Sequence, residues 1–229
     1  MRPTLFLLPG LLCDAQSWAP QIDAFAELAN IIVPDFRYVR TITAMAQLVV
    51  DVAPERFSLA GHSMGGRVAL EVFRMVPQSV ERLALLDTGV HPPKPAEQAK
   101  RQELIDLARA EGMEALAARW LPPMLHPNHS ALIPLLTEMV KRSTPDTFEN
   151  QQRALLDRPD ACALLRYIHC PTLVLCGRED LWSPVEQHEE IALAIQGFRL
   201  RIIEECGHMA PVEQPEAVTA ALREWLESR

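Results

Sequence analysis

One stretch of the sequence decides the fold: Phe57-Ser58-Leu59-Ala60-Gly61-His62-Ser63-Met64-Gly65-Gly66-Arg67-Val68-Ala69-Leu70. It predicts a strand, then the motif Gly-x-Ser-x-Gly, then a helix. A serine at such a sharp strand-to-helix turn has strained backbone geometry, and small residues at 61 and 65 relieve the crowding. The turn lifts the hydroxyl of Ser63 to the carboxyl end of the sheet. It also places the amide of Met64 at a helix N-terminus, where it can stabilise an oxyanion.

The sequence on both sides of this stretch alternates between short apolar runs and helical patterns. The apolar runs are Thr4–Leu8, Ile31–Val33, Phe57–Ala60, Leu83–Leu86, Thr172–Cys176 and Leu200–Ile203. Continuous apolar runs are typical of parallel strands covered on both faces. Helical spacing occurs at Thr43–Ala53, Gly66–Met75 and Glu216–Glu227. The alternation predicts an α/β fold, with a mostly parallel sheet of about six strands and helices on both faces.

Residues 91–169 interrupt this alternation, because they contain helical patterns but no convincing strand. The helical patterns are Ala96–Ala110, Met113–Trp120, Ser130–Arg142 and Phe148–Leu156, with nine prolines between His91 and His169. We expect a helical cap inserted over one edge of the sheet. No low-complexity linker or internal repeat divides the chain, so residues 1–229 are predicted to form a single domain.

Composition narrows the class of partner. The chain has 229 residues and a formal charge of −8, so it offers no basic surface for nucleic acid or an anionic membrane. Its five scattered cysteines suggest neither a disulfide framework nor a zinc site. No signal peptide and no transmembrane run is evident. We therefore expect a cytoplasmic protein that acts on a small molecule without metal or cofactor; its oligomeric state cannot be read from the sequence.

The elbow sequence Gly61-His62-Ser63-Met64-Gly65-Gly66 resembles that of the single-domain esterases, lactonases and carbon–carbon bond hydrolases of the α/β-hydrolase fold family. The resemblance extends over nearly the whole chain. It implies an α/β-hydrolase fold that lacks the first strands and carries a helical cap. It also implies that Ser63 is the nucleophile. Haloalkane dehalogenases and epoxide hydrolases are disfavoured, because those relatives carry aspartate at this place.

A serine hydroxyl needs a base, and the base needs a carboxylate that orients it. His208 lies on a loop after the last predicted strand and resembles the catalytic histidine of the family. Asp180 lies in a segment similar to the family's Gly-x-x-Asp-x-x-x-Pro acid loop, and the chain order Ser, Asp, His matches. Glu179 is an alternative acid. Asp87 is another, because some family members carry the acid after the strand that ends at residue 86.

The resemblance also suggests the oxyanion hole, which needs two amides. One is that of Met64, and the other should come from the loop after the first strand. Family members often have His-Gly there, whereas this chain has Pro9-Gly10, so Leu11 would donate. A plain glycine turn is the alternative. The chain also differs from the family at residues 34–40, which lack the family's glycine-rich pattern. The substrate preference of relatives therefore cannot be transferred to this chain.

Specificity is expected to come from the cap above the serine. Candidates for an apolar acyl pocket are Leu12, Trp18, Trp120, Met124, Leu125 and Trp182. Alternatively, the aromatic side chains and Met124 only pack the cap on the core. No basic cluster for a phosphate or coenzyme A head group is evident, since Arg37 and Arg67 alone are not enough.

The sequence therefore predicts a serine hydrolase, a carboxylesterase that cleaves an ester, lactone or thioester of a small, largely apolar acyl substrate through an acyl-enzyme. A carbon–carbon bond hydrolase or a cofactor-free perhydrolase would use the same residues. The fold also serves as a non-catalytic ligand receptor, but such members usually lose a residue of the triad, and this chain retains all three.

Overall fold

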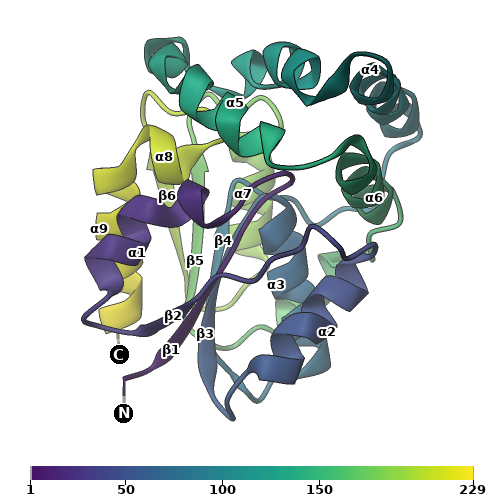
Figure 1. Ribbon diagram of the computed structural model, residues 1–229. Helices are drawn as coiled ribbons and strands as arrows, with labels where there is room; N and C mark the ends of the chain where they lie inside the picture. The colour runs from purple at the N-terminus through teal and green to yellow at the C-terminus, as the bar shows by residue number, and fades with distance from the viewer. Residues whose placement is uncertain (1, 229) are drawn as a thin grey trace.

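The computed structural model describes residues 2–228, which are built around one sheet of six parallel strands. The strands are β1 Thr4–Leu8, β2 Asn30–Ile32, β3 Phe57–His62, β4 Val80–Leu86, β5 Thr172–Gly177 and β6 Phe198–Ile203. Their order across the sheet is β2-β1-β3-β4-β5-β6 (Figure 1). The direction of chain progression reverses between β1 and β3, and open parallel sheets bind their ligands in the crevice at such a point.

Helices cover both faces of the sheet, as predicted (Figure 1). They are α1 Ala19–Phe25, α2 Ile42–Val52, α3 Met64–Met75, α4 Pro95–Trp120, α5 Ile133–Lys141, α6 Pro145–Leu156, α7 Val185–Leu193, α8 Ala210–Glu213 and α9 Pro215–Glu227. Four short 3₁₀ helices are η1 Ala15–Trp18, η2 Pro122–Met124, η3 Pro127–Leu132 and η4 Cys162–Tyr167. The pattern in the sequence predicted α2, α3 and α9, but α1 and α7 are too short to show a clear period.

The continuous apolar runs are explained by burial on both faces. In β1, Phe6 and Leu8 pack into a core with α2, α3 and α7, whereas Leu5 and Leu7 pack into a second core with α1, α8 and α9. All four side chains are at most 1% exposed. Successive strand residues point to opposite faces, so a strand between two helical layers needs apolar residues at every position.

Residues 91–169 form the helices α4, α5 and α6 with three 3₁₀ helices, and they contain no strand. Figure 1 shows α4, α5 and α6 together over one end of the sheet. The predicted helices Ala96–Ala110 and Met113–Trp120 are joined in α4, which is kinked at Gly112 (φ 85°, ψ 179°). Buried cap residues such as Leu116 and Phe148 belong to the same core as α2 and α3, so the cap shares its apolar interior with the sheet.

Candidate active site

Ser63 stands at the junction of β3 and α3 with φ 54° and ψ −116°, a strained conformation for a residue with a side chain. Its amide donates to the carbonyl of Leu86 on β4 (2.9 Å). The two glycines of the motif are required by close approach. A Cβ on Gly61 would lie 2.3 Å from the carbonyl oxygen of Gly65, and one on Gly65 would lie 2.1 Å from that of Leu8. The glycines therefore allow the turn to close tightly against β1.

The three residues predicted as a triad lie in hydrogen-bonding contact. The imidazole of His208 is 2.8 Å from Ser63 Oγ through Nε2 and 2.8 Å from Asp180 Oδ2 through Nδ1. His208 is 3% exposed and Asp180 is 2% exposed. Ser63, Asp180 and His208 follow the carboxyl ends of β3, β5 and β6, respectively. This is the geometry in which an imidazole can take a proton from a hydroxyl while a carboxylate fixes its orientation.

The carboxylate of Asp180 is held by the backbone of its own loop. Its Oδ1 accepts from the amides of Trp182 (2.8 Å) and Ser183 (3.0 Å). Burial alone would raise the pKa of Asp180, but the His208 imidazole and these hydrogen bonds outweigh burial and lower it. The alternative acid Glu179 points elsewhere, since its Oε2 accepts from the amide of Cys206.

Asp87, the other alternative acid, is fully buried nearby but has no hydrogen bond to His208. Its Oδ1 accepts from the amide of Gly177 (2.9 Å), and within the described residues its Oδ2 has no hydrogen-bond partner. Burial and the charge of Asp180 raise the pKa of Asp87 well above its usual range. The two carboxyl groups are therefore different: Asp180 is held ionised, and Asp87 is favoured in the neutral form.

Glu213 holds the histidine loop in place, a contribution that the sequence analysis did not assign. Its carboxylate accepts from the amides of Met209 (2.8 Å), Gly207 (3.1 Å) and His126 (2.7 Å). Glu213 is 3% exposed, so these hydrogen bonds satisfy an otherwise isolated buried charge. The available signal was the Glu213-Gln214-Pro215 segment that follows the loop and precedes α9.

The amides of Leu11 and Met64 are the candidate oxyanion donors, and neither donates a hydrogen bond within residues 2–228. The loop after β1 that carries Leu11 is held from the cap. There the amide of Leu12 donates to Gln151 Oε1 (2.9 Å), and Leu12 has φ 56°. Unpaired amides beside the serine are what a developing oxyanion needs.

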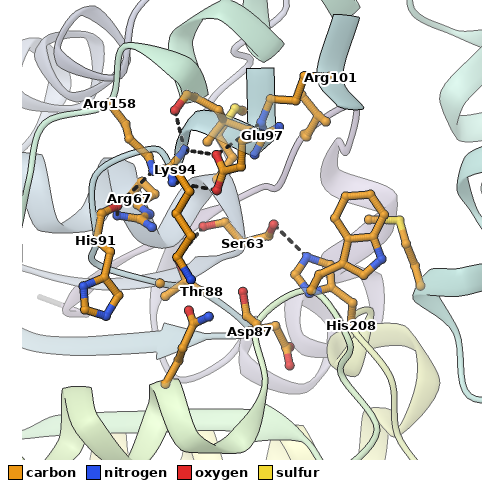
Figure 2. Close-up of a pocket in the computed structure, with 18 of the residues that line it drawn as sticks. Ser63, Arg67, Asp87, Thr88, His91, Lys94, Glu97, Arg101, Arg158 and His208 are labelled. Carbon is orange, nitrogen blue, oxygen red and sulfur yellow. Dashed lines mark hydrogen bonds and ion pairs between the residues drawn. The ribbon is translucent and has the colours of Figure 1, made fainter. Parts of the chain in front are cut away.

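A cavity of about 240 Å³ opens over Ser63 between the sheet and the cap (Figure 2). Of the six predicted pocket residues, Trp120, Met124 and Trp182 line this cavity. Leu12, Trp18 and Leu125 do not. Trp18 is fully buried in the second core, on the α1 side of the sheet. The prediction for Trp18 was wrong because an apolar residue near a motif can pack on either face of the sheet.

The other wall of the cavity is charged. Figure 2 shows it above Ser63, and its cationic side chains are Arg67, Lys94, Arg101 and Arg158, with Glu97 among them. The expectation that no basic cluster exists was wrong. Arg37 pairs with Asp35 elsewhere, but the fold brings cap residues far along the chain to Arg67. Glu97 and Arg101 are four positions apart and share one face of α4, and Lys94 immediately precedes that helix.

Two features are absent from residues 2–228. No group of three or more histidine, cysteine, aspartate or glutamate side chains is placed to hold a metal ion. No helix in this part of the chain combines the length and apolar character needed to cross a membrane.

Comparisons with known proteins agree with the fold. The model of the alpha/beta hydrolase family matches residues 5–221. A putative carbamate hydrolase RutD of Serratia proteamaculans is 31% identical over 99% of this chain and 91% of its own length. An (E)-2-((N-methylformamido)methylene)succinate hydrolase of Acinetobacter baylyi is 30% identical over 98% and 90%. A malate-bound structure of a thermophilic esterase from Thermogutta terrifontis has a TM-score of 0.90 at 32% identity, over 99% of this chain and 89% of that one. The chain therefore belongs to the alpha/beta hydrolase family.

Proposed function

We propose that this protein is a serine hydrolase that cleaves a carboxylic ester-type bond of a small substrate through an acyl-enzyme. The observation that carries the proposal is the pair of 2.8 Å contacts that join Ser63, His208 and Asp180. A hydroxyl becomes a useful nucleophile when a base can take its proton in the same step as it attacks.

In this mechanism, Ser63 Oγ attacks the carbonyl carbon while its proton moves to His208 Nε2. The amides of Leu11 and Met64 stabilise the oxyanion. The tetrahedral intermediate collapses, the C–O bond to the alcohol breaks, and the alcohol leaves with the proton from Nε2. Water then attacks the acyl-enzyme, gives a proton to Nε2, and the C–O bond to Ser63 breaks. The acid is released and Ser63 recovers its proton.

The bond class is supported by the small cavity and by two of the relatives named above, the thermophilic esterase and the putative carbamate hydrolase. A cavity of about 240 Å³ lies below the range of about 300–1,000 Å³ typical for drug-sized ligands, which favours short acyl groups. Carbon–carbon bond hydrolysis and perhydrolysis would use the same three side chains. A non-catalytic receptor would have no need for the unpaired amides beside Ser63.

The test is a screen of short-chain esters, lactones and thioesters with the purified protein and with Ser63→Ala. We expect turnover of at least one class, a loss of about 10⁴-fold or more in Ser63→Ala, and labelling of Ser63 by a fluorophosphonate probe. Ser58→Ala, on β3 below the elbow, is the matched control and should retain activity. If the protein shows no turnover of any ester and no labelling by the probe, it is a receptor and the proposal is wrong.

A further inference from the structure

The cationic wall of the cavity deepens this proposed function, on which the inference rests. We propose that the substrate carries a free carboxylate, and that Arg67 together with Arg101 binds it beside the scissile bond. The planar guanidinium group offers paired N–H donors that match the two oxygens of a carboxylate.

Arg158 shows what a structural arginine looks like in this cavity. Its Nε donates to the carbonyl of His91 (3.0 Å), and its two terminal nitrogens hold Glu97 (2.8 and 3.0 Å) and the carbonyl of Leu155 (2.7 Å). Arg158 is 7% exposed. Every nitrogen of its guanidinium is engaged, so it is already neutralised and held in place.

Arg67 and Arg101 differ from Arg158, because each keeps unpaired donors. Arg67 uses only Nη1, toward the carbonyl of His91 (2.9 Å). Arg101 donates from Nη1 to Gln152 Oε1, while its buried Nε lies 3.6 Å from Glu97 and has no hydrogen-bond partner within the described residues. Both residues line the cavity, so a ligand that supplies acceptors to their remaining N–H groups would be stabilised there.

The charge balance of the wall points the same way. Four cationic side chains face the cavity, against one carboxylate that is held ionised, Glu97, whose pKa is lowered by Arg158 despite burial. The other carboxyl at the cavity is Asp87, whose raised pKa favours its neutral form. Burial and the charge of Arg158 lower the pKa of Arg67 to about 9. Arg67 thus remains charged at neutral pH, and an incoming anion would relieve the repulsion among the arginines.

The position of Arg67 limits the length of the ligand. Arg67 is in the first turn of α3, and its amide approaches the carbonyl of Ser63 (3.4 Å). One helical turn advances about 5.4 Å, so the backbone of Arg67 lies about one turn from the nucleophile, and both residues line the same cavity. The residues Trp120, Met124 and Trp182, which line the same cavity, are apolar. A short carbon chain that ends in a carboxylate matches both walls and the small volume.

The experiment compares charged and neutral esters of similar size. Monomethyl glutarate carries the carboxylate on the acyl part, with methyl pentanoate as its neutral counterpart; 4-acetoxybutanoate carries it on the alcohol part, with butyl acetate as counterpart. We expect at least one charged ester to be preferred in kcat/KM by about tenfold or more, the value of one charge-assisted hydrogen bond. Arg67→Gln and Arg101→Gln should each reduce this ratio, and Arg37→Gln, at a half-buried arginine that does not line the cavity, should leave it unchanged.

Binding gives a readout that does not depend on catalysis. In Ser63→Ala, calorimetry with glutarate should detect binding that weakens when Arg67→Gln is added and when salt is raised. Turnover of neutral esters with no preference for charged ones, and no glutarate binding, would overturn the inference and leave the proposed function intact. Glutarate binding without any esterase activity or fluorophosphonate labelling would instead overturn the proposed function and leave the anion site standing.

Discussion

The carboxyl edge of the sheet and the helical cap meet at one cavity but are held in different ways. At the edge, polar groups are fixed by nearby backbone: Ser63 by the carbonyl of Leu86, and Asp180 by the amides of Trp182 and Ser183. The cap contacts the edge partly through long side chains, such as that of Gln151, and partly through the carbonyl of Met124, which accepts from the amide of His208 (2.7 Å). The difference suggests that the chemistry is built into local turns, whereas specificity depends on how the cap sits.

The sharpest test of the edge compares its two buried aspartates. We expect Asp180→Asn to lower kcat by about 10⁴-fold, because the amide no longer fixes the tautomer of His208 or stabilises its charged form. Asp87→Asn should lower kcat much less, since Asp87 does not contact His208. Steady-state kinetics on one ester at pH 7.5 measures both.

A second measurement separates the aspartates by stability. The pKa of Asp87 is raised by burial, so its carboxyl destabilises the folded state increasingly as the pH rises above the unfolded value of about 3.9. Asp87→Asn should therefore unfold at a higher temperature than the parent at pH 8, and lose that advantage at pH 3. Equal losses of activity in the two variants would break the distinction between them.

His62 provides a test of how the stability of the folded protein depends on pH at the carboxyl edge of the sheet. It is 1% exposed, its Nε2 donates to the carbonyl of His208 (2.7 Å), and its Nδ1 has no partner within residues 2–228. Burial and the proximity of His208 lower the pKa of His62 to about 3. Below about pH 6.5 the imidazole is protonated in the unfolded chain but stays neutral in the folded chain. The free energy of unfolding is therefore highest above pH 6.5 and decreases as the pH falls. The full loss, reached below about pH 3, is about 5 kcal/mol.

His62→Gln keeps an N–H donor near Nε2 but cannot be protonated. Chemical denaturation of both proteins between pH 7 and pH 4 should show a smaller loss of stability in the variant. His169→Gln, outside the core, is the control and should follow the parent. Parallel pH curves for His62→Gln and the parent would contradict a buried neutral imidazole.

The contrast between edge and cap also explains what the sequence could predict. The six strands, the elbow and the positions of Asp180 and His208 follow from apolar runs and short motifs, because each is set by residues close along the chain. Even there, Trp18 was misplaced, since an apolar residue beside a motif can face either core. The choice between Asp180 and Asp87 also needed coordinates, because both follow strands at the same edge.

The cationic wall was missed for a different reason. Arg67 is on the elbow helix, whereas Arg101 and Arg158 come from the cap, 34 and 91 residues further along. No local pattern reports that they face one cavity. The spacing of Glu97 and Arg101 indicates one helical face, but not the surface on which that face lies.

Gln151 links the two regions, and its removal is the smallest of the expected effects. It is 2% exposed on α6, and it accepts from the amide of Leu12 (2.9 Å) and donates to the carbonyl of Phe36 (3.4 Å). Gln151→Leu keeps the volume but leaves both backbone groups buried without partners, a cost of about 1–3 kcal/mol. Because Leu12 follows the proposed oxyanion donor Leu11, kcat should fall by about tenfold with little change in KM.

Two further variants serve as controls for Gln151→Leu. Gln98→Leu alters an exposed glutamine of the cap and should change neither stability nor kcat. Gln151→Glu retains an acceptor for the amide of Leu12 and should recover part of the lost kcat, which a purely structural role would not predict. A fall in stability with unchanged kcat would show that the cap only covers the edge. A fall in kcat that Gln151→Glu partly restores would show that the cap also positions the edge, and that the two regions act as one site.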